Sequence, residues 1–218
     1  MIIDLNLAGK PVIVVGGGIE GTRKVKSLLG QNCKIIVVSN RLNKFLLGLA
    51  EQGKIDIVKT ILRDADLLDR FEKPFLILAA TNDRELNRKL VQKAKRIGAF
   101  AYAADDPSIS DFIHPAVINI DNTIFIAIST KGRSPAMART LRIRAERILK
   151  RLIKKEDVDY IRLASFVRSA ARNSLKDPDS RKKFLYTVIR DRKIKNFIKN
   201  KKFEDAKSVA MEILKAWA

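Results

Sequence analysis

A glycine-rich loop that directly follows a short apolar segment is the feature that most constrains the fold of this chain. Residues 12–15 are valine and isoleucine, and residues 16–21 follow them with the spacing G-x-G-x-x-G. An apolar, β-branched run of this kind predicts a buried strand of a parallel sheet. The residues after the loop predict a helix over 19–29 that ends near Gly30. A strand, a glycine loop and a helix in this order are typical of a unit that binds a dinucleotide.

The three glycines of the motif each meet a separate geometric need. Gly16 allows a tight turn, Gly18 lets the backbone approach a pyrophosphate, and Gly21 allows close packing of helix and strand. The helix then offers free N–H groups and its positive end to phosphate. A glycine turn without a ligand is the alternative interpretation. We predict cofactor contacts along the whole loop, at Gly16, Gly17, Gly18, Ile19, Glu20 and Gly21.

The first half of the chain continues to alternate between predicted strands and helices. Further strands are expected at 34–38, 55–58, 75–79 and 100–103, and further helices at 42–50, 65–71 and 84–97. This alternation predicts an α/β fold, a Rossmann-type parallel sheet with helices on both faces. Thr81, Asn82 and Asp83 follow one of these strands, where a polar residue can cap the next helix. We expect Thr81 and Asn82 near the cofactor.

The end of the second predicted strand bears on the choice of cofactor. An Asp or Glu at this place usually binds the ribose hydroxyls of NAD, but this chain has Ser39, Asn40 and Arg41 there. Ser39 or Asn40 can hydrogen-bond a ribose, whereas Arg41 can pair with the 2′-phosphate of NADP. The residues by themselves therefore leave NAD and NADP open.

The pattern changes after Asp105. Two strands joined by a turn are expected at 117–119 and 124–128, and Ser134-Pro135 predicts the start of a long helix with Ser134 as its N-cap. From about residue 156 onward the chain is expected to be helical. We predict three parts, which are a Rossmann domain at 1–113, a small α+β region at 114–150 and a helical C-terminal domain at 151–218.

The charge of the chain favours an anionic partner. Lys and Arg number 44 against 24 Asp and Glu, a formal net charge of +20, and half of the excess lies in residues 151–218. Nucleic acid, a membrane surface and a polyanionic small molecule all fit this charge, as does a heavily solvated lysine-rich surface. Aromatic residues are only 6% and no helix-turn-helix, RNA-recognition or zinc pattern is evident, which argues against nucleic acid.

Two further observations bear on location. No run of eighteen apolar residues is present, so we expect no transmembrane helix and no membrane partner. Cys33 is the single cysteine, which excludes an intrachain disulfide framework and favours the cytoplasm.

Four segments of the sequence, in order, resemble one known family. They are VIVVGGGIEGTRK at 12–24, LAATND at 78–83 followed by Asn87, ADDP at 104–107 followed by DFIHP at 111–115, and STKGRSPAMAR at 129–139. These segments resemble the precorrin-2 dehydrogenase/sirohydrochlorin ferrochelatase family, which also forms the N-terminal part of bacterial siroheme synthases. The resemblance covers roughly residues 1–150, and the helical tail is only loosely similar.

The resemblance implies an enzyme of siroheme, and hence tetrapyrrole, biosynthesis. The implied reaction is the NAD-dependent oxidation of precorrin-2 to sirohydrochlorin. Some members also insert iron, so Fe²⁺ enters here only as a substrate of that second activity. The resemblance further implies a homodimer in which residues 114–150 are a dimerisation region that exchanges contacts between subunits.

Asp105 is the candidate catalytic residue. It matches the catalytic Asp of the family and follows the end of a predicted strand, where doubly wound sheets bind their ligands. A base at this place can accept the proton that leaves the substrate during dehydrogenation. A loop carboxylate that caps a turn is the alternative, and the adjacent Asp106 is the alternative assignment.

Three residues are candidates for binding the substrate. Ser134 resembles the substrate-pocket serine of the family, although an N-cap alone would also explain it. Arg139, like Arg133, can pair with the carboxylates of precorrin-2. His114, the only histidine, is a base, an iron ligand or a structural residue. No His, Cys, Asp and Glu residues have the spacing of a transition-metal site, so no resident metal is expected.

Two other functions compete with the dehydrogenase. A non-catalytic dinucleotide-sensing regulatory module would share the glycine loop but would need neither Asp105 nor the segment around Ser134. A basic nucleic-acid-binding protein would use the charge of the tail, and its binding would depend steeply on salt.

Overall fold

A computed structural model describes residues 2–61 and 63–217 of the chain. The chain divides into two compact units, Met1–His114 and Pro115–Ala218. The separation of a dimerisation region at 114–150 from a helical domain at 151–218 stays a prediction.

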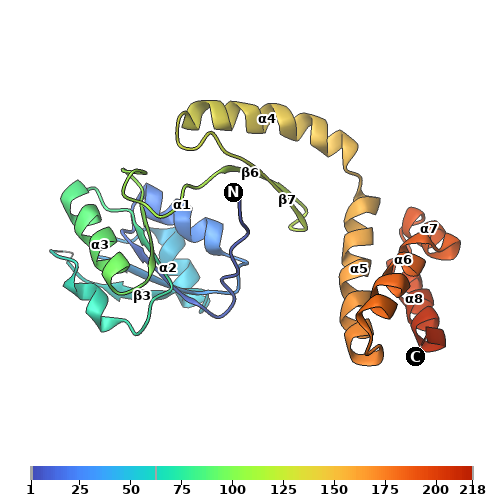
Figure 1. Cartoon of the computed structure of the whole chain (residues 1–218). Coiled ribbons are helices and arrows are strands. Elements are labelled where there is room, and N and C mark those ends of the chain that lie inside the picture. Colours follow the sequence, from blue (N-terminus) through green and yellow to red (C-terminus); the bar gives the residue numbers. More distant parts are fainter. Residues whose placement is uncertain (1, 62, 218) are drawn as a thin grey trace. The chain divides into compact units, whose positions relative to one another are not determined.

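The first unit is built on a parallel sheet. Its elements in chain order are β1 (Pro11–Val15), α1 (Ile19–Leu28), β2 (Lys34–Ser39), α2 (Lys44–Glu51), β3 (Asp56–Lys59), η1 (Asp66–Arg70), β4 (Leu76–Ala79), α3 (Arg84–Arg96) and β5 (Phe100–Ala103). The strand order is β3-β2-β1-β4-β5, and all neighbouring pairs are parallel. This is the order of a Rossmann sheet, so the predicted fold class is confirmed. Figure 1 shows the helices α1, α2 and α3 of this unit around the sheet.

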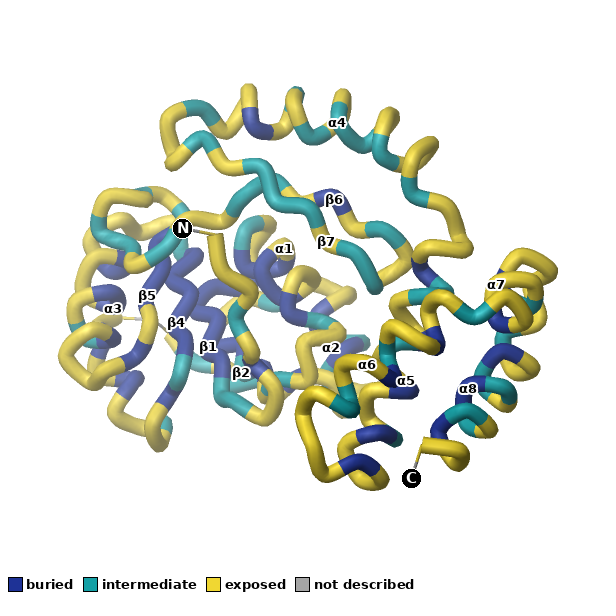
Figure 2. The backbone as a smooth tube through the Cα atoms, turned by 45° about the vertical axis from the view of Figure 1, so that its right-hand side comes forward, coloured by how far each residue is buried: buried dark blue, intermediate teal, exposed yellow. Residues whose placement is uncertain are grey.

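The sheet has an apolar core on each of its two faces. On one face, Val12 and Val14 of β1 pack with Val25 of α1 and Leu46 of α2. On the other face, the alternate residues of β1 and β4 pack with α3 and the short 3₁₀ helix η1. Since β1 and β4 are covered on both sides, they are buried along almost their whole length (Figure 2). Burial on both faces explains why the sequences of β1 and β4 are continuous apolar runs.

Two details of the first unit differ from the sequence prediction. The helix expected at 65–71 is a 3₁₀ helix of five residues, η1. The helix expected from residue 42 begins at Lys44, because the Asn43 side chain accepts a hydrogen bond from Leu46 N at 3.0 Å and caps it. Asp83, which follows Thr81 and Asn82, caps α3 in the same way through Leu86 N.

The second unit begins with an antiparallel pair of strands and a long helix. Strands β6 (Ala116–Ile120) and β7 (Ile124–Ile128) pair with each other, and α4 (Pro135–Leu152) packs against β6. Ser134 caps α4 and Pro135 is its first residue, as predicted. Ala138 is the buried residue of α4, which is otherwise half-buried or exposed along its length (Figure 2).

The rest of the second unit is helical, as predicted. It contains α5 (Lys155–Ser174), α6 (Pro178–Arg190), α7 (Arg192–Lys199) and α8 (Phe203–Trp217). Leu163, Phe184, Ile194 and Leu214, one from each helix, lie in a common apolar core. Among the described residues, no helix combines the length and the apolar composition needed to cross a membrane.

Candidate dinucleotide and catalytic site

The carboxyl ends of the strands bring the predicted site residues of the first unit to one edge of the sheet. The register aligns Val15 of β1 with Val38 of β2 and with Ala79 of β4, and Ala79 with Ala103 of β5. The segments that follow these strands therefore emerge at the same level. They contain, in sheet order, Ser39 and Asn40, the glycine loop, Thr81 and Asn82, and Asp105. This edge, beside β1 where the strand order reverses, is where Rossmann sheets bind dinucleotides.

Gly16 and Gly21 hold the loop against its neighbours. Gly16 has φ +112°, and a Cβ on it would lie 2.3 Å from the Ala80 carbonyl oxygen. A Cβ on Gly21 would lie 1.8 Å from the Gly16 carbonyl oxygen. Any larger residue would push the strand β4 segment or the helix α1 away, so both positions require glycine for the reasons the motif suggests.

Gly17 and Ser39 form a contact that the sequence analysis did not anticipate. The Ser39 hydroxyl accepts a hydrogen bond from Gly17 N at 3.0 Å and donates one to Arg41 O at 2.8 Å. A Cβ on Gly17 would lie 2.4 Å from that same Arg41 oxygen. Ser39 thus ties the glycine loop to the end of β2, and its proton is already donated within the protein. Asn40, which is exposed, is the side chain left to contact a ribose at this place.

The first turn of α1 fits the pyrophosphate of a dinucleotide. A Cβ on Gly18 would meet no heavy atom within 4 Å, so the backbone is open on that side. No side chain caps α1 at Gly18, which leaves the N–H groups of the first turn available to phosphate. Glu20, the acidic residue of this turn, is paired with Arg23 at 2.6 Å. Ile19 is 88% exposed beside the loop.

A buried amide links the edge of β4 to Asp105. Asn87 of α3 is 1% exposed, and its Nδ2 donates to Thr81 O at 3.1 Å and to Asp105 Oδ1 at 2.8 Å. Its Oδ1 accepts from Thr81 N at 3.1 Å and from Thr81 Oγ1 at 2.7 Å. Both donors of the amide and its acceptor are therefore used. The family resemblance includes Asn87, but its spacing in sequence does not reveal these contacts.

Asp105 and Asp106 have different environments. Arg84 Nε lies 3.5 Å from Asp105 Oδ2, and the Asp105 side chain is 27% exposed. Asp106 instead caps the turn that follows, since its Oδ1 accepts from Ser108 N at 2.9 Å. Hydrogen bonds from Ser108 lower the pKa of Asp106. Asp106 therefore has a structural use, whereas Asp105 has one oxygen held by Asn87 and the other beside an exposed guanidinium.

His114 packs in an aromatic cluster at the end of the first unit. Its ring lies edge-on to Tyr102 at 4.7 Å and to Phe112 at 5.2 Å between centroids, although the residue as a whole stays exposed. Burial of the ring, with smaller contributions from Lys24 and Arg23, lowers the pKa of His114 to about 4. The imidazole is therefore neutral near pH 7, as a hydrogen-bonding partner or metal ligand would require.

Ser134 and Arg139 belong to the second unit, and their role toward the substrate stays a prediction. The Ser134 Oγ accepts a hydrogen bond from Met137 N at 3.2 Å, so the residue acts as an N-cap. Thr130 holds it in place, since Thr130 Oγ1 accepts from Ser134 N and donates to Ser134 O. Arg139 is exposed.

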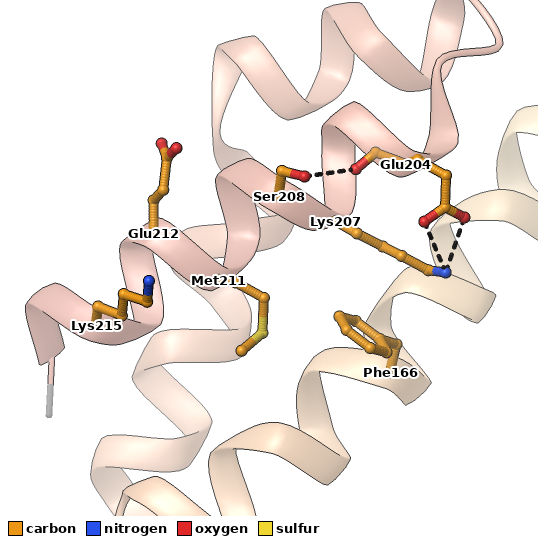
Figure 3. A pocket seen from close by; sticks show the side chains of 7 residues that line it. All are labelled: Phe166, Glu204, Lys207, Ser208, Met211, Glu212 and Lys215. Carbon is orange, nitrogen blue, oxygen red and sulfur yellow. Dashed lines mark hydrogen bonds and ion pairs between the residues drawn. The ribbon is translucent and has the colours of Figure 1, made fainter.

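A metal site and a pocket are two other kinds of site that the described part of the chain could contain. Within residues 2–61 and 63–217, no group of three or more His, Cys, Asp and Glu residues could hold a metal ion. A pocket of about 460 Å³ in the helical part of the second unit involves Phe166 of α5 and residues of α8 (Figure 3). Lys207 in this pocket is already paired with Glu204 at 2.9 Å, and none of the predicted site residues lines it.

The fold and the glycine loop together define a Rossmann-type dinucleotide-binding protein. Residues 3–116, slightly more than half of the chain, match the family described as "Putative NAD(P)-binding". The chain belongs to this NAD(P)-binding family, which confirms the family resemblance on which the sequence analysis relied.

The chain is also similar in sequence to proteins named siroheme synthases. The chain is 36% identical to the siroheme synthase of Neisseria meningitidis serogroup C (strain 053442) over 182 residues, which cover 84% of this chain and 36% of the relative. It is 38% identical to siroheme synthase 1 of Aeromonas salmonicida (strain A449) over 147 residues, which cover 67% of this chain and 30% of the relative. The chain thus spans about a third of the length of these relatives.

A solved structure shares the fold over nearly the whole chain. It is that of SirC, a precorrin-2 dehydrogenase, with a TM-score of 0.68 and 23% sequence identity. The match covers 97% of this chain and 99% of SirC. This likeness shows that both the Rossmann unit and the helical unit have counterparts in one known fold.

Proposed function

We propose that the protein oxidises precorrin-2 to sirohydrochlorin with NAD, a step of siroheme biosynthesis. The observation that carries this proposal is the placement of Asp105, which Asn87 holds at the cofactor edge of the sheet at 2.8 Å. A module that only sensed a dinucleotide would need the glycine loop but not a carboxylate fixed in this way. The relatives named as siroheme synthases and the fold shared with SirC supply the substrate class.

The reaction removes a hydride and a proton from precorrin-2. The bound nicotinamide supplies the hydride acceptor. Asp105 is the base that accepts the proton, because its carboxylate lies beyond the end of β5 and accepts a hydrogen bond from the buried Asn87 amide. Arg84 Nε lies 3.5 Å from the other oxygen of this carboxylate.

NAD is the cofactor we propose, bound along Gly16–Gly21 with Asn40 at the ribose and Thr81 and Asn82 along its other side. Asn40 is exposed at the end of β2, and no carboxylate stands beside it at positions 39 to 41. Titration with NAD and NADP separately tests this choice, and tighter binding of NADP would assign Arg41 to the 2′-phosphate.

The proposal extends to the substrate and to the assembly. Ser134, Arg139 and His114 are the residues we expect to bind precorrin-2, and the expected compartment is the cytoplasm. We also expect a homodimer formed through β6, β7 and α4, whose apolar side chains include Phe125 at 55% and Ile148 at 67% exposure. Large exposed apolar side chains on one region favour an interface.

The test is anaerobic formation of NADH from precorrin-2 and NAD by the wild type and by Asp105→Asn. Asparagine keeps the shape of the side chain and an oxygen for the hydrogen bond from Asn87 but removes the base. We expect turnover to fall by about 10²-fold or more, a typical loss for a general base, while NAD binding is retained. Asp106→Asn, the matched control, should keep most of its activity.

Two outcomes would contradict the proposal in different ways. A wild type that binds the dinucleotide but oxidises no precorrin-2 would indicate the sensing module instead. An Asp105→Asn variant with unchanged turnover would be consistent with the dehydrogenase activity but would show that another residue is the base.

A further inference from the structure

Lys24 of α1 is a buried lysine whose ammonium has no counter-ion among the residues that the structure describes. The residue is 4% exposed, and its Nζ lies 3.9 Å from the centroid of the Tyr102 ring on β5. Within the part of the chain that the structure describes, no carboxylate lies within ion-pair distance of this Nζ and no oxygen accepts a hydrogen bond from it. A charged amine placed in this way costs free energy unless something compensates it.

The ammonium of Lys24 is the part of the side chain that reaches solvent. No fully buried side-chain nitrogen or oxygen in the described residues lacks a hydrogen-bond partner. Since the Lys24 Nζ has no such partner, it cannot be fully buried. The aliphatic stem is therefore covered, and the charged end opens to solvent beside Tyr102 and the exposed His114.

The groups around this opening are those that would receive an anion. Arg23 is a second cation on the same helix, and it affects the pKa values of Lys24, Tyr102 and His114. The nearby acid, Glu20, is already paired with Arg23 at 2.6 Å. Burial is the main cause of the raised pKa of Tyr102, and Asp105 makes a small contribution in the same direction, so the candidate base acts electrostatically on the same cluster.

We propose that Lys24, together with Tyr102 and His114, forms a binding site for one carboxylate group of the substrate. This inference rests on the proposed function and deepens it, because precorrin-2 carries eight carboxylates. The carboxylate would accept hydrogen bonds from the Lys24 ammonium at the opening beside the His114 ring. One rim of the macrocycle would thereby be fixed beside Asp105, which is three residues beyond Tyr102 in the chain.

The site would couple binding to protonation of Lys24. Burial, followed by repulsion from Arg23, lowers the pKa of Lys24 to about 8, and Glu20 opposes this shift. A bound carboxylate favours the charged amine and raises its pKa, so binding near pH 8 takes up protons. The other facing groups stay neutral there, because burial raises the pKa of Tyr102 and lowers that of His114 to about 4.

The experiment uses the full chain and two probes, a stable porphyrin octacarboxylate and NAD, titrated separately by calorimetry in buffers of different ionisation enthalpy. Lys24→Met removes the charge and keeps most of the stem, and Lys24→Arg keeps the charge. Lys26→Met, on an exposed lysine of the same helix, is the matched control. Circular dichroism checks that each variant is folded.

The expected result is specific to the porphyrin. Lys24→Met should weaken porphyrin binding by roughly tenfold or more, the usual effect of losing a hydrogen bond between charged groups, and should abolish proton uptake near pH 8. Lys24→Arg should retain most of the affinity, and NAD should bind all variants equally.

Two results would overturn the inference. Weaker NAD binding with unchanged porphyrin binding would assign Lys24 to a dinucleotide phosphate. Unchanged affinity for both probes would leave Lys24 with a structural role only. Because porphyrin binding is measured without turnover, an inactive wild type would contradict the dehydrogenase proposal and not this carboxylate site.

Discussion

Asn87 is a buried residue that positions the candidate catalytic residue, Asp105, through a hydrogen bond. Its amide joins Thr81, which follows β4, to Asp105, which follows β5. Because the amide is 1% exposed and its donors and acceptor are all used, it has no freedom to turn. Asn87 is therefore a positioning residue, and its effect on catalysis passes through the carboxylate of Asp105.

Replacing Asn87 by leucine tests this role. The change removes the hydrogen-bond partner of Thr81 N and of the Asp105 carboxylate. Because both hydrogen bonds are partly buried, we expect a combined cost of about 1–3 kcal/mol. We expect a lower free energy of unfolding in urea and a fall in kcat, with the KM for NAD little changed. Gln92→Leu, at an exposed position of α3, should match the wild type in both measurements. A stability loss without any change in kcat would show that Asn87 is structural only.

Contacts with two neighbouring strands hold the glycine loop in the position where it can bind a ligand. Gly16 N donates to Val38 O at 2.9 Å, and its missing Cβ leaves room for the Ala80 carbonyl. The loop is thus held between the ends of β2 and β4, and the first turn of α1 is fixed at the edge of the sheet. The open side of Gly18 is the surface left for a ligand.

Alanine substitutions at two of these glycines should both weaken NAD binding but should differ in their effect on stability. In Gly21→Ala the new Cβ would lie 1.8 Å from Gly16 O, a backbone atom, so we expect a loss of about 1–3 kcal/mol in stability and loss of NAD binding. In Gly18→Ala the Cβ meets nothing within 4 Å, so stability should change by less than about 0.5 kcal/mol while NAD binding weakens. Urea denaturation and NAD titration measure the two effects. Equal stability of the two variants would contradict this division of roles.

Local patterns in the sequence predict the elements better than the contacts between them. The apolar runs predict β1 and β4, and the Ser134-Pro135 pair predicts the start of α4. The hydrogen bond from Gly17 to Ser39 spans 22 positions, and the one from Asn87 to Asp105 spans 18. Contacts at such separations depend on strand order and register, which no local pattern contains. The contact between Lys24 and the Tyr102 ring was not predicted for the same reason, because Tyr102 lies on a different element.

The distribution of charge over the whole chain suits an anionic substrate. Residues 181–202 carry ten Lys and Arg and one Asp, and that acid, Asp191, caps α7. In the described structure, none of these ten basic residues forms an ion pair within the chain. An uncompensated positive field raises the local concentration of a polycarboxylate and weakens with salt. The helical unit can therefore assist capture of the proposed substrate without contacting it specifically.

The exposed apolar residues of the second unit predict that the protein assembles. A two-stranded sheet is marginally stable by itself, and Ile148 and Leu152 of α4 are 67% and 69% exposed. We expect wild-type chains to form dimers and Ile148→Glu to shift them to monomers in sedimentation velocity, because the carboxylate would be buried in an apolar interface. NAD binding should persist, since the glycine loop lies in the other unit. Arg147→Glu, which changes the charge at the adjacent exposed position, is the control. Dissociation of both variants would indicate that the contact is electrostatic. A monomeric wild type would contradict the predicted dimer.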